Sequence, residues 1–312
     1  MTPKAKISLV IPCYNEEAAI ESFYTELVRQ LPDDYQFEII LVDDGSKDGT
    51  LNCIKNLAEQ DEHVSYISFS RNFGHQNALK AGFDHASGDC AICMDADLQH
   101  PPELIKTFIE KWEEGHDIVH SIRTDESTIG KRKKYSSKVF YKILNHFSDV
   151  EIQSGMADFR LIDRKVLDQL TNFSENFIFY RGLFPWMGFR QTSISYVANE
   201  RIAGQTKYTF GKMVRFASIG LTSFSVKPLR YSIYLGLLFA FLAFTYLIYA
   251  VLVYLFTDWA ITGWTSLVVS IMFFGGINLI MLGVIGEYLG KLFIESKRRP
   301  NYLVAESNLN KR

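Results

Sequence analysis

Acidic side chains follow two of the short apolar runs in the first hundred residues. Asp43 and Asp44 come directly after one run, and Asp95 and Asp97 follow another, with Gln99 two positions further along. Carboxylate and amide oxygens are the hard ligands that Mg²⁺ and Mn²⁺ use, commonly with water and substrate phosphates in the remaining positions. An isolated Asp-x-Asp pair is typical of a solvated turn. Beside further carboxylate-bearing loops, however, we expect Asp95, Asp97 and Gln99 to hold a divalent ion.

The elements that must position these acids alternate between strand-like and helix-like segments. Short apolar runs occur at Ile7–Ile11, Phe37–Val42, Val64–Phe69, Cys90–Met94 and Asp117–Ile122. Helical spacing of apolar residues fills the intervals, at Glu17–Leu31, Gly49–Ala58, Gln76–Ala86 and Pro102–Glu113. This alternation predicts an α/β domain around a parallel, doubly wound sheet. Because ligands bind beyond the carboxyl ends of the strands in such sheets, the aspartates are expected to converge on one edge.

Several function classes are disfavoured by what the sequence contains. No GxGxxG or GxxxxGK[ST] loop follows the first apolar run, which disfavours a dinucleotide oxidoreductase and a P-loop NTPase. A net charge of −2 offers little for binding nucleic acid, so no nucleic-acid partner is expected. The four cysteines contain one CxxC pair, Cys90 and Cys93, without a second pair to complete a zinc site. They fit a reducing compartment without disulfides.

Two long uncharged stretches occupy the last quarter of the chain. Ile233–Phe256 and Trp264–Ile285 are each long enough, as helices, to cross a hydrocarbon core of about 30 Å. Basic residues precede the first stretch and follow the second: Lys227, Arg230, Lys291, Lys297, Arg298 and Arg299. By the positive-inside rule we expect a multi-pass protein of the inner (cytoplasmic) membrane with both termini cytosolic. No signal peptide is visible.

Two basic segments have the pattern of helices that lie on a membrane surface. Residues 131–148 combine lysines and arginines with apolar residues at helical spacing, and 211–226 does the same. A solvated helix face is the alternative for the first. The predicted organisation is a cytosolic α/β domain over 1–210, a juxtamembrane helix over 211–230, two transmembrane helices within 231–290 and a cytosolic basic tail over 291–312. Anionic membrane lipid is thus an expected partner.

Arginines near the predicted sheet edge are candidates for binding phosphate. Arg123 directly follows the fifth apolar run, and Arg132 lies in the first basic segment. The guanidinium group offers a forked set of donors that matches phosphate oxygens.

Motifs over nearly the whole chain resemble the inverting glycosyltransferases of family 2. The similarity is to the dolichyl-phosphate mannose synthase-like and bacterial polyprenyl-phosphate branches, with the O-antigen-modifying glucosyltransferases looking closest. The motifs are Val10-Ile-Pro-Cys-Tyr-Asn-Glu16, Leu41-Val-Asp-Asp-Gly-Ser46, Arg71-Asn-Phe-Gly74, Met94-Asp-Ala-Asp-Leu-Gln-His-Pro-Pro-Glu103, Ser154-Gly-Met-Ala-Asp-Phe-Arg160, Glu200-Arg-Ile-Ala-Gly204 and Lys207-Tyr208, followed by the apolar hairpin.

The resemblance implies a Rossmann-like nucleotide-sugar domain of the GT-A type. It places the nucleotide against residues of the first, second and fourth strand ends: Pro12, Tyr14, Glu16, Asp43, Asp44 and Asp95. It assigns Asp95, Asp97 and Gln99 to Mg²⁺ or Mn²⁺ on the diphosphate. This agrees with the ligand set expected from the residue types alone.

The resemblance further implies sugar transfer from a nucleotide sugar, UDP-glucose or a related UDP-hexose, to polyprenyl phosphate. In this hypothesis Arg123, Arg132, Arg201 and Lys207 steer the phosphates, and Asp158 orients the sugar or the metal. A structural role as a helix cap or ion-pair partner is the alternative for Asp158. We expect in-line attack with inversion through a transition state of oxocarbenium character.

Three other readings stay open at this point. A membrane-tethered glycosyltransferase with a soluble or polysaccharide acceptor shares the nucleotide-sugar motifs, and a non-catalytic membrane scaffold is an alternative from another class. A processive polysaccharide synthase needs more spans and usually a QxxRW motif, which Arg190 and Gln191 do not supply. Two spans are too few for a lipid translocation path, so a separate flippase and a downstream transferase are expected partners. Association of copies through the hairpin is also plausible.

Overall fold

The chain forms two compact units in the computed structural model. The model describes residues 4–124, 145, 153, 155–173, 175–176, 178–197, 225–256 and 263–309. One unit, the sheet unit, comprises Met1–His146, Val150–Gly220 and Pro300–Arg312. The other, the helical unit, comprises Phe147–Asp149 and Leu221–Arg299. The predicted surface helix over 131–148 lies outside the described residues except for Asn145, and so does most of the predicted juxtamembrane helix.

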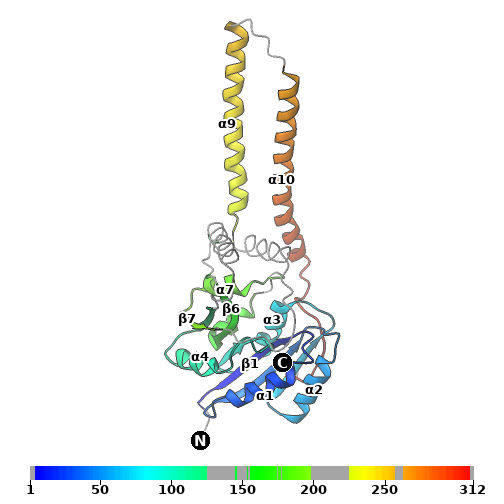
Figure 1. Cartoon of the computed structure of the whole chain (residues 1–312), viewed down its shortest axis with the longest axis vertical. Helices are drawn as coiled ribbons and strands as arrows, with labels where there is room; N and C mark the ends of the chain where they lie inside the picture. The colour runs from blue at the N-terminus through cyan, green and yellow to red at the C-terminus, as the bar shows by residue number, and fades with distance from the viewer. Residues whose placement is uncertain are drawn as a thin grey trace. The chain divides into compact units, whose positions relative to one another are not determined.

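An eight-stranded sheet organises the sheet unit (Figure 1). Its spatial order is β7-β5-β6-β4-β1-β2-β3-β8. The strands are β1 (Lys6–Cys13), β2 (Gln36–Asp43), β3 (Val64–Phe69), β4 (Cys90–Cys93), β5 (Ile118–Arg123), β6 (Met156–Asp163), β7 (Gln191–Tyr196) and β8 (Val304–Ser307). The helices are α1 (Ile20–Gln30), α2 (Thr50–Gln60), α3 (His75–His85), α4 (Leu104–Glu113), α6 (Arg164–Leu170) and α7 (Tyr180–Met187). The Rossmann-like GT-A architecture expected from the resemblance is confirmed.

The sheet is mixed rather than wholly parallel, which corrects one expectation. β1 pairs in parallel with β2 and β4, and β2 pairs in parallel with β3, as the alternation of strands and helices predicts. β6 enters between β4 and β5 and runs antiparallel to both. β8 runs antiparallel to β3 at the far edge. The four parallel strands therefore carry their loops to one edge, as required for a shared site.

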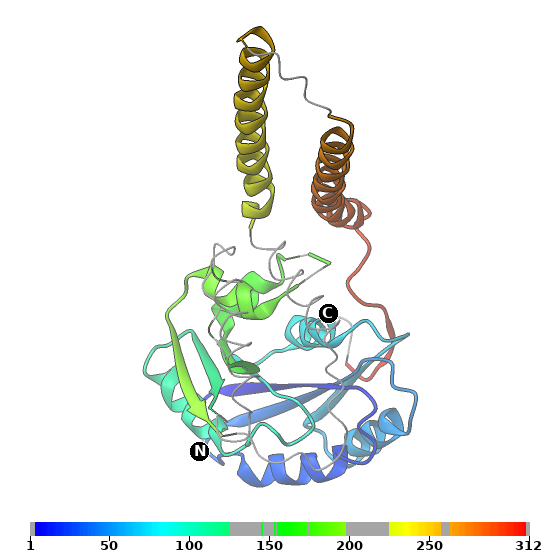
Figure 2. The same cartoon turned by 45° about the horizontal axis from the view of Figure 1, so that its top comes forward.

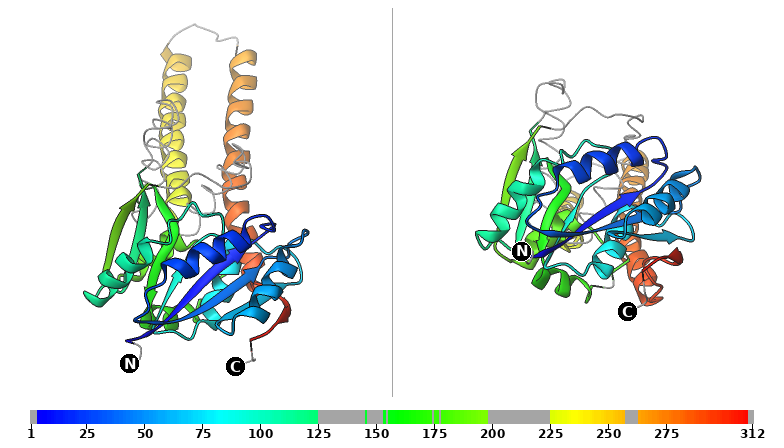
Figure 3. Two further views of the ribbon diagram at one scale, coloured as in Figure 1. Left: turned by 60° about the horizontal axis from the view of Figure 1, so that its bottom comes forward. Right: turned by 90° about the horizontal axis from the view of Figure 1, so that it is seen from below.

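Helices cover both faces of the sheet because the buried strands are apolar on both sides. Helices α1, α2 and α4 lie on one face of the sheet (Figure 3), and their residues form a core cluster with Ile7, Leu9 and Ile11 of β1. On the other face Val10 meets α3, where a β-carbon at Gly82 would overlap the Val10 side chain. The absence of a side chain at Gly82 thus lets α3 pack closely on β1.

The end of the chain returns to the sheet unit as β8. The sequence predicts a basic tail over 291–312, but Val304–Ser307 pairs with β3, as Figure 2 shows in red. The Lys55 ammonium on α2 lies 2.8 Å from the Glu306 carboxylate, and the backbone N–H of Ser70 donates to Leu303 over 3.0 Å. The segment after the second long helix is therefore part of the α/β domain.

The helical unit contains two long helices, α9 (Lys227–Phe256) and α10 (Trp264–Ser296). Segments long and apolar enough to cross a membrane lie at Leu229–Tyr246 and Ser270–Ser296. The predicted spans fall within these helices, although α10 continues past the predicted end at Ile285. Tyr288 of α10 donates its hydroxyl to the Ser225 carbonyl over 2.7 Å, which ties the start of α9 to α10.

Candidate functional site

A cleft of about 330 Å³ opens at the carboxyl ends of the parallel strands. Its lining comes from the end of β1 and from the residues that follow β1, β2, β3 and β4: Pro12, Cys13, Tyr14, Glu16, Asp44, Asn72, Gly74, His75, Asp95, Ala96 and Asp97. Three of the four predicted aspartates, Asp44, Asp95 and Asp97, thus meet at one site. The convergence expected from the strand order is confirmed for these three.

The loop after β1 is fixed to the loop after β2 by side chain to backbone hydrogen bonds. Asn15, in the left-handed region at φ 55°, accepts from the backbone N–H of Lys47 over 2.8 Å. The N–H of Glu16 donates to the Thr50 hydroxyl over 2.8 Å. These bonds hold Tyr14, whose side chain is exposed, at the mouth of the cleft.

Asp44 organises the opposite wall of the cleft. Its carboxylate accepts from the Asn72 side-chain amide over 2.9 Å and from the backbone N–H groups of Phe73 and Gly74 over 2.6 and 3.0 Å. Burial raises the pKa of Asp44, although these donors and the charge of His75 act in the opposite direction. The carboxylate therefore holds residues 72–74 against the end of β2.

Asp43 is buried behind this wall, and both of its carboxylate oxygens accept hydrogen bonds. Its carboxylate accepts from the Ser46 N–H over 3.0 Å and from the Ser68 hydroxyl over 2.8 Å, and it is 1% exposed. Asp43 is not among the residues that line the cleft as described. In the structure it joins β2 to β3, and its expected contact with the nucleotide stays a prediction.

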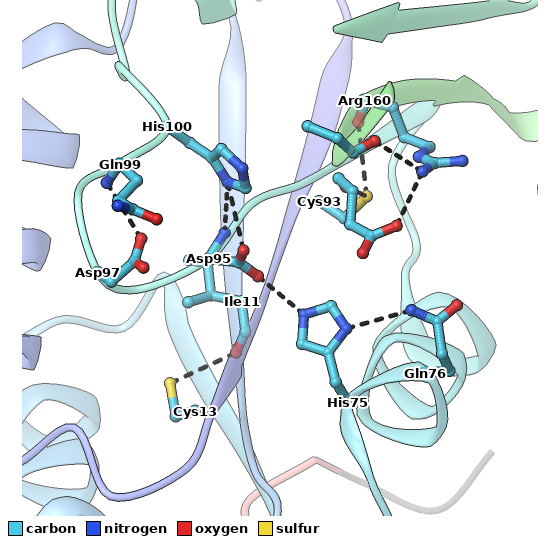
Figure 4. A network of polar contacts seen from close by, with 12 residues as sticks. Ile11, Cys13, His75, Gln76, Cys93, Asp95, Asp97, Gln99, His100 and Arg160 are labelled. Atoms are coloured by element: carbon cyan, nitrogen blue, oxygen red, sulfur yellow. Dashed lines mark hydrogen bonds and ion pairs between the residues drawn. The ribbon is translucent and has the colours of Figure 1, made fainter. Parts of the chain in front are cut away.

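Asp95 lies between two histidines (Figure 4). Its Oδ1 is 2.8 Å from Nε2 of His75, and its Oδ2 is 3.8 Å from Nδ1 of His100. Burial alone raises the pKa of Asp95, but the charges of His100 and His75 outweigh this and lower it to about 2. Burial lowers the pKa of His75, but the Asp95 carboxylate raises it by more, and the resulting pKa is about 9. Asp95 is therefore ionised at neutral pH.

Asp97 and Gln99 lie in the short turn after β4. Oδ1 of Asp97 accepts the backbone N–H of Gln99 over 3.0 Å, and both side chains are partly exposed (Figure 4). Asp97 lines the cleft beside Asp95, whereas Gln99 is not among the lining residues. The turn brings the predicted ligand residues to one place at the strand end.

The donor set fits a divalent metal that is shared with a phosphate ligand. Within the residues that the structure describes, no three His, Cys, Asp or Glu side chains are arranged to hold a metal ion. Asp95 and Asp97 nevertheless offer two carboxylates, and Mg²⁺ is usually bound by one or two carboxylates with substrate phosphates rather than by an all-protein cage. The site is thus suited to a metal that arrives with a nucleotide diphosphate.

Asp158 sits on β6 in an ion-pair network, which is one of the two roles that the sequence analysis left open for it. Arg181 of α7 contacts it with Nε at 3.2 Å and Nη2 at 3.0 Å, and Nη2 of Arg160 lies 3.0 Å from Oδ1. Burial raises the pKa of this carboxyl, but the Arg181 and Arg160 charges hold it well below its usual range. Asp158 is therefore ionised at neutral pH and paired with two arginines.

The predicted phosphate-binding side chains are only partly described. Arg123 ends β5 with an exposed side chain, and its backbone N–H donates to Gly155 over 2.9 Å. Arg132, Arg201 and Lys207 lie outside the residues that the structure describes.

The site also contains residues that the sequence analysis left out. His75 and Asn72 come from the motif Arg71-Asn-Phe-Gly74 and its neighbour, so their position directly after the third strand was the available signal. Cys13 is among the lining residues, but its thiol is buried in the core and keeps its proton at neutral pH, because burial and nearby carboxylates raise its pKa well above the usual value. Cys13 thus offers no nucleophile there.

Comparisons with known proteins place this site in a family. The family model described as Glycosyl transferase family 2 matches residues 8–171. "Uncharacterized glycosyltransferase YkcC" of Bacillus subtilis (strain 168) is 44% identical over 98% of this chain and 95% of its own length. "Prophage bactoprenol glucosyl transferase homolog" of Escherichia coli (strain K12) and "Bactoprenol glucosyl transferase" of Shigella phage SfV are each 44% identical, over 96% of this chain and 98% of theirs. The similarity therefore extends through both units.

Proposed function

The chain belongs to glycosyl transferase family 2, and we propose that it transfers a glucosyl unit from a nucleotide sugar to polyprenyl phosphate. The observation that carries the proposal is the acidic cleft, where Asp44, Asp95 and Asp97 meet at the parallel strand ends in a chain similar over nearly its full length to bactoprenol glucosyl transferases. The two long apolar helices supply the membrane association that a polyprenyl acceptor requires.

The donor nucleotide occupies the cleft in this proposal. Pro12, Tyr14 and Glu16 contribute one wall and Asp44 the other, with Asp43 behind it. The relatives named as glucosyl transferases favour a glucose donor, and UDP-glucose or a related UDP-hexose is the donor that we propose.

Asp95 and Asp97, with Gln99, hold Mg²⁺ or Mn²⁺ against the donor diphosphate. When bound, the metal supplies charge neutralisation that favours departure of the nucleoside diphosphate. The protein's own contribution is to keep Asp95 ionised and oriented, through the histidines on either side of it.

The acceptor needs no general base. A phosphomonoester has a second pKa near 6, so polyprenyl phosphate is largely dianionic at neutral pH and already nucleophilic. A phosphate oxygen forms the new bond to the anomeric carbon while the bond from that carbon to the diphosphate breaks, and the electron pair leaves with the nucleoside diphosphate. Arg123, Arg132, Arg201 and Lys207 neutralise the approaching anions. Asp158 orients the sugar or the metal, held by Arg181 and Arg160.

The reaction takes place at the cytosolic face of the inner membrane in this proposal, with both termini on that side. A separate flippase and a downstream transferase then move and use the lipid-linked sugar, in a pathway of the cell envelope. We also propose that copies of the chain associate through the hairpin, and this part of the proposal rests on the sequence alone.

The test incubates detergent-solubilised full-length protein with undecaprenyl phosphate, Mg²⁺ or Mn²⁺ and a panel of nucleotide sugars. Organic-phase mass spectrometry is expected to show a polyprenyl-phosphate-hexose that disappears with chelator. Asp97→Ala should abolish it, and Asp33→Ala, an exposed carboxylate outside the cleft, should not. A labelled product that stays in the aqueous phase supports a soluble acceptor instead. The absence of any transfer while nucleotide sugar still binds favours the non-catalytic reading.

A further inference from the structure

We propose that His75 is the positioning residue of Asp95, and that Gln76 and the first residue of α7 fix His75 in this role. The inference rests on the proposed metal site and deepens it, because it names the group that orients one metal ligand. His75 is the first residue of α3 and lines the cleft together with Asp95.

His75 is the ring that donates to the Asp95 side chain. The two neighbouring histidines differ in what their facing nitrogens do. Nδ1 of His100 lies 3.0 Å from the backbone nitrogen of Asp95 but 3.8 Å from Oδ2, which is too far for a hydrogen bond to the carboxylate. Nε2 of His75 lies 2.8 Å from Oδ1 of Asp95 and is the donor in that pair. One oxygen of Asp95 is thereby fixed in direction, which fixes the plane of the carboxylate.

Gln76 holds the His75 ring from its other side (Figure 4). The backbone N–H of Tyr180, at the start of α7, donates to Oε1 of Gln76 over 3.2 Å. This bond sets the orientation of the amide, so its Nε2 faces Nδ1 of His75 at 3.3 Å. A neutral ring then accepts from Gln76 at Nδ1 and carries its proton on Nε2. A charged ring also carries a proton on Nε2, although its Nδ1 can no longer accept from Gln76. Donation to Asp95 is therefore independent of the charge on His75.

The role of His75 is local rather than structural. Its side chain is 40% exposed, so its removal deletes little buried surface. What its removal changes is the carboxylate, which loses a charge-assisted hydrogen bond and gains freedom to rotate. A ligand that must be ordered when the metal arrives binds that metal more weakly.

The experiment compares His75→Leu, which has no donor, with His75→Gln, whose amide can place an N–H near the original Nε2. His63→Gln, an exposed histidine paired with Asp61 outside the cleft, is the control. Binding of Mn²⁺ to UDP-loaded, detergent-solubilised protein is followed by electron paramagnetic resonance, and thermal unfolding is measured in parallel. We expect about tenfold weaker Mn²⁺ binding for His75→Leu, the scale of one hydrogen bond to a charged group. His75→Gln should recover most of the affinity, and all variants should unfold near the wild-type temperature.

Transfer activity gives a second readout. For His75→Leu the Mn²⁺ concentration at half-maximal rate should rise, while the rate at saturating Mn²⁺ stays within a few-fold of wild type. Equal Mn²⁺ affinity of His75→Leu and wild type overturns the inference and leaves the proposed metal site intact. A wild-type protein that binds no Mn²⁺ with UDP present overturns the metal site itself, and the inference with it.

Discussion

His120 and Arg160 lie directly opposite each other in the antiparallel pairing of β5 and β6, and each keeps one buried nitrogen without a hydrogen-bond partner within the described structure. Nε2 of His120 is 2.8 Å from Oε1 of Gln191 and therefore carries the proton, which leaves Nδ1 bare. Nη1 of Arg160 is the other unpaired atom. Burial and the Arg160 charge together lower the pKa of His120 to about 4.

This arrangement predicts a loss of stability in mild acid. In the unfolded chain His120 titrates near 6.5, so the unfolded state binds more protons than the folded state between about pH 6.5 and 4. Above pH 6.5 the titration of His120 costs no stability. As the pH drops through this window, the free energy of unfolding falls by about 3 kcal/mol in total. Thermal unfolding at pH 7 and 4.5 should show a smaller decrease for His120→Gln than for wild type. Identical decreases in the two proteins would contradict the assignment.

The ion pairs of Asp158 predict a stability cost when its charge is removed. Asp158→Asn removes the ion pair of the buried Arg160 and the contact with Arg181, and the loss of one partner of a buried pair costs about 3–5 kcal/mol. The unfolding temperature should fall by about 6–20 °C for a unit of this size. Asp168→Asn is the matched control, because its pair with Arg164 at 3.6 Å is largely exposed and contributes less than about 1 kcal/mol.

Activity separates the two readings of Asp158. If the carboxylate orients the sugar or the metal, Asp158→Asn loses transfer even at temperatures where it is folded. A folded Asp158→Asn enzyme with wild-type turnover removes Asp158 from the proposed mechanism and leaves it a structural ion-pair partner.

The part of the fold that the sequence predicts is the part with local periodicity. β1 to β5 and α1 to α4 follow from apolar runs and helical spacing within single segments. The meeting of Asp44, Asp95 and Asp97 follows from the rule that parallel strands end at one edge. The antiparallel β6 did not follow, because no local pattern sets the direction in which a strand enters a sheet.

The relationships that escaped prediction join residues far apart in the chain. Arg181 meets Asp158 across 23 positions, and His75 meets Asp95 across 20. Such pairs depend on how α3 and α7 pack on the sheet, which residue types do not encode. β8 escaped for another reason. It has four residues, follows a basic stretch and is largely exposed, so neither length nor hydrophobicity marks it.

We expect substitution of Gly45 by alanine to weaken nucleotide binding. It sits at φ 64° directly after Asp44, and a β-carbon there would overlap the backbone of Arg71. Gly45→Ala must push residues 71–74, which carry the donors to Asp44, away from that carboxylate. The affinity for UDP should therefore fall about tenfold or more, as for the loss of a hydrogen bond to a charged group.

Gly188→Ala is the control that distinguishes the cost of a left-handed backbone from the steric overlap of a new β-carbon. Gly188 has φ 71° with open space around its Cα, so both variants carry the cost of about 1–2 kcal/mol for a left-handed alanine. Isothermal titration with UDP should show the affinity loss for Gly45→Ala alone. An equal loss in both variants would mean that the Gly45 effect is general destabilisation.

We expect the contacts of Tyr302 to stabilise the pairing of β8 with β3 at the end of the chain. Its ring stacks on Phe69 with centroids 5.0 Å apart, and its hydroxyl donates to Asp84 of α3 over 3.0 Å. Tyr302→Phe removes only the hydrogen bond and should cost about 1 kcal/mol, whereas Tyr302→Ala also removes the half-buried ring and should cost about 2–3 kcal/mol. Because β8 then pairs less tightly with β3, the N–H of Ser70, which donates to Leu303, should exchange with solvent much faster in Tyr302→Ala. Unchanged exchange at Ser70 in Tyr302→Ala would show that the strand pairing holds the chain end without the ring. Ser70 lies two residues before Asn72, which binds Asp44, so we further expect the affinity for UDP to fall as this exchange becomes faster.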